Sequence, residues 1–200
     1  MGAVKLDGMN ITNEFEQLLY SKFKNCLLDW KEELRADTNL ITFVCGEDSN
    51  FCQASFLLSY NTFSHYRNRV AQVGEAEAKW VPAEWICHFL AETPKTDNEL
   101  ELWHSWCRAH SIPVDDDLTN DPYSTGQTIY EVEPLFGASA SLCGQIAQQL
   151  HTEGTIIEVF GRVLPIYITD AEGLIDRKET LQANGSQVIE EFAEFSKDWD

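Results

Sequence analysis

Residues 40–58 have the sequence LITFVCGEDSNFCQASFLL, and this stretch decides the fold class. Its two apolar runs, 40–45 and 51–58, are rich in the β-branched and aromatic residues that favour strands. Between them lies a turn-rich segment, 46–50, with one glycine, two acidic residues, a serine and an asparagine. Two apolar runs around such a segment predict a β-hairpin with a five-residue loop.

A second pair of strands is predicted over residues 155–160 and 163–169, which are again β-branched and aromatic and are separated by Gly161 and Arg162. Pro165 has no N–H to donate to a sheet, so it favours an edge position or a bulge. We therefore expect two hairpins that form one antiparallel or mixed sheet.

Several amphipathic helices are predicted around this sheet. Apolar residues recur every three or four positions over residues 15–34, with Glu14 and Glu16 in the first turn. Further helices are expected at 63–73, capped by Asn61 or Thr62, at 82–90, at 97–110, capped by Asp97, at 134–153, at 172–183 and at 186–196. Segregated hairpins and helices indicate an α+β fold in one domain over residues 1–200, with 111–130 as a candidate subdomain joint.

The six cysteines are dispersed and form no CxxC pair, which predicts buried reduced thiols. The N-terminal residues have no continuous apolar stretch behind a basic one, and no apolar run approaches the ~20 residues needed to span a bilayer. We expect a soluble cytoplasmic protein without membrane contact.

The chain is strongly acidic, with 33 Asp and Glu against 14 Lys and Arg and a net charge of −19. Residues 1–80 hold 8 basic and 11 acidic residues, whereas residues 81–200 hold 6 and 22. Such a charge repels nucleic acid and anionic lipid and favours a basic protein partner. The uneven distribution suggests a negative face formed by the C-terminal part of the chain.

Candidate catalytic residues are few. No serine-hydrolase elbow, P-loop or dinucleotide-binding loop occurs. His104, Cys107 and His110 lie three residues apart, so all three could face one zinc ion only with distortion, and no fourth ligand is indicated. Cys107 with either histidine could be a thiol and its base, but this spacing supplies neither a third orienting group nor an oxyanion hole. The alternative is that Cys107 belongs to the core. We predict no catalytic residue, no metal and no cofactor.

Two segments are candidates for binding a partner. Asp115, Asp116, Asp117 and Asp121 form an acidic stretch that lacks the ligand spacing of an EF-hand, and Glu99 and Glu101 precede it on a predicted helix. Trp80 and Trp85 flank Pro82 in a compact corner, where tryptophan either anchors the next helix or contacts a partner.

Three short stretches resemble members of a bacterial family, the domain of unknown function numbered 4303. They are an Asn-Thr step before a helix at 61–62, a Trp-x-Pro-x-x-Trp corner at 80–85, and a Phe-Gly-x-x-x-Pro strand at 160–165, followed by an acidic turn at 170–172 and an Ala-Asn step at 183–184. At residues 173–174 the chain has Gly-Leu where family members favour aromatic residues. The resemblance implies a relation to immunity proteins that neutralise secreted bacterial toxins, and it supplies no catalytic residues.

The leading hypothesis is therefore an acidic protein-binding domain, in its specific form an immunity-type inhibitor of a basic, nuclease-like toxin. The alternative is a small metal-dependent or thiol hydrolase centred on His104, Cys107 and His110. A structural domain without a tight partner is the third interpretation.

Overall fold

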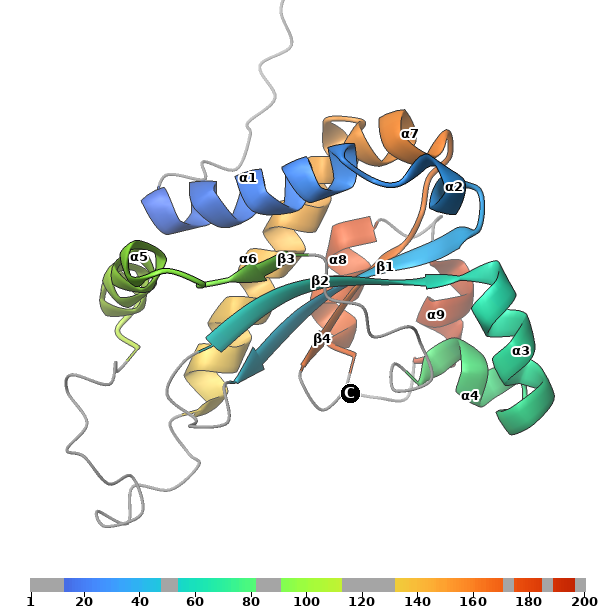
Figure 1. Ribbon diagram of the computed structural model, residues 1–200. Coiled ribbons are helices and arrows are strands. Elements are labelled where there is room, and N and C mark those ends of the chain that lie inside the picture. The colour runs from blue at the N-terminus through green and yellow to red at the C-terminus, as the bar shows by residue number, and fades with distance from the viewer. Residues whose placement is uncertain are drawn as a thin grey trace, which may run out of the picture.

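The computed structural model describes residues 13–47, 54–81, 91–112, 132–170, 175–184 and 189–196. It confirms an α+β fold with one mixed sheet surrounded by helices (Figure 1). The strands are β1 (Thr38–Glu47), β2 (Ala54–Thr62), β3 (Ala91–Thr93) and β4 (Ile166–Asp170). The helices are α1 (Glu14–Leu28), α2 (Glu32–Arg35), α3 (Phe63–Val73), α4 (Glu75–Trp80), α5 (Asp97–Ala109), α6 (Val132–Thr152), α7 (Thr155–Phe160), α8 (Arg177–Asn184) and α9 (Glu190–Phe195).

The sheet has the strand order β3-β2-β1-β4. β1 and β2 pair antiparallel, with Phe43 opposite Leu58 and Cys45 opposite Phe56, which confirms the first predicted hairpin. β3 adds antiparallel to β2, and β4 adds parallel to β1. The residues between β1 and β2 that were predicted as the loop are described only up to Glu47, which belongs to β1.

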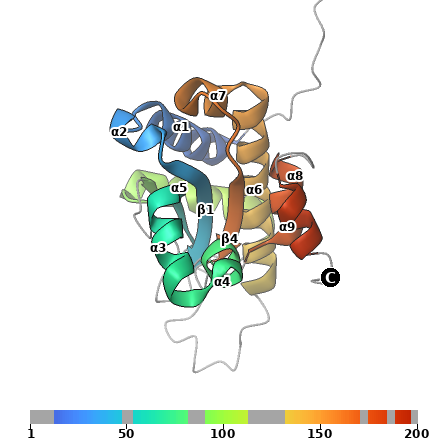
Figure 2. The same ribbon diagram turned by 90° about the vertical axis from the view of Figure 1, so that its right-hand side faces the viewer.

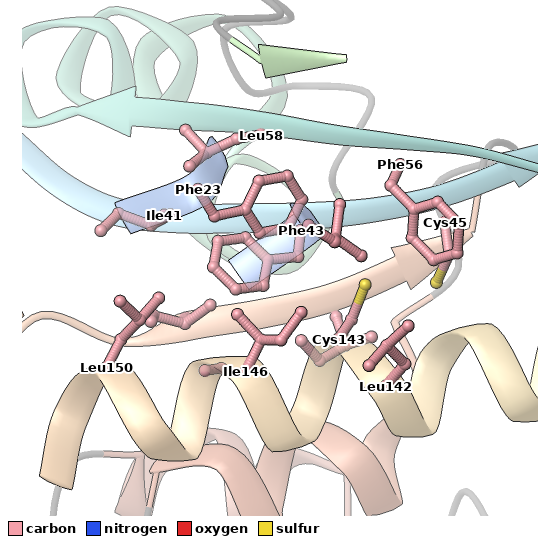
Figure 3. Close-up of a cluster of buried hydrophobic side chains, with 14 of the residues drawn as sticks. Phe23, Ile41, Phe43, Cys45, Phe56, Leu58, Leu142, Cys143, Ile146 and Leu150 are labelled. Atoms are coloured by element: carbon pink, nitrogen blue, oxygen red, sulfur yellow. The ribbon is translucent and has the colours of Figure 1, made fainter. Parts of the chain in front are cut away.

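The larger of two hydrophobic clusters lies on one face of the sheet, where alternate residues of β1 point. Ile41 and Phe43 belong to the same buried cluster as Phe23 of α1 and Ile146 of α6, and the rings of Phe23 and Phe43 are 4.4 Å apart. Figure 3 shows these side chains filling the layer between the sheet and α6. Leu40, the neighbour of Ile41, belongs to a second cluster on the opposite face, so both faces contribute buried apolar surface.

The first predicted helix is shorter than expected and is followed by a separate turn of helix. Asn13 caps α1, because its side chain accepts a hydrogen bond from Phe15 N at 2.9 Å and Glu16 completes a capping box. α1 ends at Leu28, and Trp30 turns into the core against the rings of Tyr60 and Phe160. The inward turn of Trp30 separates α1 from α2.

The second predicted hairpin is wrong. Residues 155–160 form α7, which buries Thr155, Ile156, Val159 and Phe160. Burial at positions 1, 2, 5 and 6 of the segment is the spacing of one helix face, and it overrides the β propensity of the side chains. Gly154 and Gly161, with φ of 80° and 67°, adopt the left-handed backbone that separates α7 from its neighbours.

β4 begins at Ile166, after Pro165, and lies at an edge of the sheet as the proline predicted. Its outer edge is closed by side chains of α8 and by one antiparallel bridge, in which Thr169 pairs with Ile175 and Asp176 N donates to the Ile168 carbonyl oxygen at 2.8 Å. Ile166 N donates to Asn184 Oδ1 at 2.7 Å, and Ile168 N donates to Thr180 Oγ1 at 3.0 Å. In Figure 2, α8 lies beside α6 on the β4 side of the sheet. Buried polar side chains thus satisfy backbone groups that an edge strand leaves unpaired.

Other boundaries were predicted with mixed success. Thr62 caps α3, which ends at Gly74, as expected. Residues 75–80, for which no helix was predicted, form α4, with Glu75 and Glu77 in its first turn and Lys79 in its last, an order that suits the helix dipole. The helix predicted at 82–90 lies outside the described residues. No helix in the described part of the chain is both long and apolar enough for a membrane span.

Candidate functional site

The acidic half of α5 is the described part of the predicted partner-binding surface. Thr96 caps this helix by accepting a hydrogen bond from Glu99 N at 3.3 Å, so Asp97 is its first residue rather than its cap. Glu99 Oε2 also accepts a hydrogen bond at 2.7 Å from the backbone N of Lys95, the residue before the cap. These two hydrogen bonds fix where the acidic residues of the first two turns lie.

Glu99 also joins α5 to α1. Its Oε1 lies 2.6 Å from Lys22 Nζ, and the Glu99 side chain is only 13% exposed. Burial alone would raise the pKa of this carboxyl, but the Lys22 ammonium and the Lys95 N–H outweigh it and lower the pKa. A partner that bound Glu99 directly would have to displace Lys22, so the main role of Glu99 is to stabilise the contact between α1 and α5.

Glu101, unlike Glu99, is exposed, as is Asp97. Both are positioned by the packing of α5, since Trp103 and Trp106 of the same helix are buried against Phe15 of α1. Trp106 Nε1 further donates to Glu16 Oε1 at 3.0 Å. The acidic side chains of α5 are therefore displayed from a rigidly packed helix.

The other predicted partner-binding residues are not placed by the structure. Asp115, Asp116, Asp117, Asp121 and Trp85 lie outside the described residues, and Trp80 ends α4 with its side chain also outside them.

The exposed charge is strongly unbalanced over the described side chains, where twelve acidic residues are exposed against five basic ones. The exposed acidic residues are Glu14, Asp29, Glu32, Glu33, Glu75, Glu77, Asp97, Glu101, Glu153, Glu158, Glu190 and Glu194. The exposed basic residues are Lys31, Arg67, Lys95, Arg108 and Lys178. The acidic residues therefore outnumber the basic ones on the surface of the described part of the chain, and not only in the sequence.

The three residues of the alternative catalytic group differ in burial: His104 is half-buried, Cys107 is buried and His110 is exposed. Cys107 is 1% exposed, and burial raises the pKa of its thiol to about 12. The ring of His110 is exposed and lies 4.3 Å from the ring of Trp106, while its Nδ1 is 2.8 Å from the Trp106 carbonyl oxygen. Within the described ranges, no three His, Cys, Asp or Glu side chains form a group that could hold a metal ion. Cys107 is a neutral core thiol at neutral pH, not an activated nucleophile.

A polar cluster that the sequence analysis missed joins α1 to the end of α6. Lys24 Nζ lies 2.6 Å from Glu153 Oε2 and donates to the Tyr20 hydroxyl at 2.8 Å, and Tyr20 donates to Glu153. Burial acts to raise the pKa of Glu153, but Lys24 and its other donors lower it to about 2. The four-residue spacing of Tyr20 and Lys24 was a local signal, whereas their partner 129 positions away from Lys24 was not.

Glu179 was also missed. It is 4% exposed on α8, with one carboxylate oxygen paired to Lys178 and the other without a hydrogen-bond partner among the described residues. Its sequence context, Arg-Lys-Glu-Thr, resembles that of a solvated helix, and only the packing of α8 on α6 buries it.

Comparison with protein-family models, with curated proteins and with solved structures gave no match. The likeness to family 4303 therefore stays a prediction.

Proposed function

We propose that this protein binds a basic protein partner, and that it acts as an immunity-type inhibitor of a basic, nuclease-like toxin. The observation that carries the proposal is the outward surplus of carboxylates, twelve exposed acidic residues against five basic ones over the described side chains. A surface of this kind accelerates association with a cationic protein and disfavours acidic ones.

The exposed residues Asp97 and Glu101 support α5 as one part of the contact surface. The chain continues from α5 towards Asp115, Asp116, Asp117 and Asp121, and we assign these to the same surface. In the inhibitor, such carboxylates would occupy the positively charged cleft in which a nuclease holds the phosphates of its substrate. The partner's active site would then be blocked without any chemistry on the part of this chain.

The experiment is a kinetic binding measurement with the product of the adjacent gene, using charge reversals of α5 and of the acidic stretch. We expect Glu101→Lys and the triple reversal of Asp115, Asp116 and Asp117 to slow association, and added salt to slow the wild type in the same way. Glu190→Lys is the matched control, because it changes the net charge equally at an exposed position on α9.

Two results would count against the proposal in different ways. Equal effects of Glu101→Lys and Glu190→Lys would contradict the location on α5, while leaving general electrostatic steering. Failure of the wild type to bind, or binding that is independent of salt, would contradict electrostatic recognition of this partner.

A further inference from the structure

Two cysteines from distant parts of the sequence meet in the core. Cys45 of β1 is 2% exposed and Cys143 of α6 is fully buried. Figure 3 shows both sulfur atoms in the layer between the sheet and α6. Cys45 Sγ donates its proton to the Thr169 carbonyl oxygen at 3.3 Å. In the same figure Cys45 points into this layer from β1, and Cys143 points into it from α6.

The surroundings keep this pair in the thiol form. Burial is the main cause that raises the pKa of Cys143, and the contact with Cys45 and the negative charge of Glu179 raise it further. Glu179 lies tightly against α6, because a Cβ on Gly144 would come within 2.8 Å of Glu179 Oε2. Thiolates are the reactive form of cysteine, so the pair reacts only slowly while the core stays closed.

We propose that Cys45 and Cys143 form an intramolecular disulfide when the protein is exposed to a small peroxide, and that this bond fastens β1 to α6. The placement of the pair supports it, because the two buried side chains are directed from β1 and from α6 into the same layer of the core.

The chemistry balances with hydrogen peroxide as the oxidant. One sulfur attacks a peroxide oxygen, the O–O bond breaks, and a sulfenic acid and one water form. The second sulfur then attacks the sulfenic sulfur, the S–S bond forms, the S–O bond breaks, and a second water leaves. The two thiol protons end in the two waters, and two electrons pass from the sulfurs to the peroxide.

The bond would strongly restrict the unfolded chain. It closes a loop of 98 residues, for which chain entropy predicts one of the larger stabilisations that a disulfide provides. For a chain of this size the corresponding rise in the unfolding midpoint is about 10 °C.

The test is peptide mapping of the folded protein after treatment with hydrogen peroxide, with remaining thiols alkylated. We expect one linked pair of peptides that contains Cys45 and Cys143, and a higher unfolding midpoint that is reversed by a reductant. Oxidation of the half-buried Cys26 serves as an internal control, because it shows that the oxidant has reacted with a thiol of the same molecule. If Cys26 is oxidised while Cys45 and Cys143 can still be alkylated, or if either of them is linked to a different cysteine, the proposal is overturned.

Two variants sharpen the measurement. Cys143→Ser should abolish the peroxide-dependent rise in the midpoint, whereas Cys107→Ser, which alters another buried thiol, should retain it. If Cys143→Ser does not fold, the mapping of the wild type decides the question alone.

Discussion

The outer edge of β4 allows a sharp prediction, because one side chain serves four polar groups there. Asn184 Oδ1 accepts from Ile166 N at 2.7 Å and lies 3.3 Å from His151 Nε2. Its Nδ2 donates to the carbonyl oxygens of Ile166 at 2.6 Å and Thr180 at 2.7 Å. Asn184 is 7% exposed, so water cannot readily replace these contacts. The perturbation is Asn184→Ala.

The magnitude follows from the groups left behind. Alanine removes the partner of both the N–H and the C=O of Ile166, a residue that is itself fully buried. Each buried polar group without a partner costs about 1 to 3 kcal/mol. Allowing for partial relaxation of α8, we expect the free energy of unfolding to fall by about 3 kcal/mol, a large part of the 5–15 kcal/mol typical of whole proteins.

The assay is denaturant unfolding of Asn184→Ala beside the matched control Gln182→Ala, which truncates an exposed amide on the same helix. The control should change the free energy of unfolding by less than about 0.5 kcal/mol. Asn184→Asp separates hydrogen bonding from volume: it keeps an acceptor for Ile166 N–H but loses both donors, so it should also destabilise. If Asn184→Ala costs no more than Gln182→Ala, the amide does not close the sheet edge.

Two further predictions concern helix contacts. Glu153→Gln should destabilise the fold above about pH 4.5 by less than about 1 kcal/mol, because the side chains of Lys24 and Glu153 are about one third exposed. The difference in unfolding free energy from the wild type should vanish as the pH falls towards 2, and denaturation curves recorded over this pH range measure it. The sign follows because the pKa of Glu153 is lowered on folding, so protonation favours the unfolded chain. On α6, Gly144→Ala should destabilise by about 1 to 3 kcal/mol because its Cβ meets Glu179, whereas Gly137→Ala, with open space at its Cβ, should stabilise by up to about 1 kcal/mol. Thermal unfolding of the two glycine variants should show shifts of opposite sign, and shifts of the same sign would contradict the close approach of α8 to α6.

The parts of the fold that could be predicted from sequence are those with a local signal. The first hairpin has strand-forming residues on both sides of a turn, and α3 lies between a capping threonine and a terminating glycine. The strand predicted at 155–160 is wrong because the same residues fit two patterns. Their β-branched side chains favour a strand, whereas the spacing of Ile156, Val159 and Phe160 favours a helix, and burial against α1 and α6 decides for the helix.

The pairing of β4 with β1 had no such signal. The two strands are separated by more than a hundred residues, and no local pattern in β4 predicts that α8 closes its outer side. The candidate site likewise combines features that the sequence predicts with features that only the tertiary structure shows. The exposure of Glu101 and the burial of Cys107 follow from the helical period of α5, but the partners of Glu99 and Glu153 come from α1 and required the tertiary structure.

The ion pairs of α1 explain how a chain of charge −19 can fold and still present a negative surface. α1 holds two basic residues, and each is paired with a carboxylate from another helix, Lys22 with Glu99 of α5 and Lys24 with Glu153 at the end of α6. Both cations therefore hold helices together, and of their two partners only Glu153 is among the exposed carboxylates. Salt should then act on two properties in opposite directions. It screens the repulsion among exposed carboxylates, which favours the compact state, and it weakens attraction to a basic partner. Stability that rises with salt while association slows would distinguish a recognition surface from charge that serves only solubility.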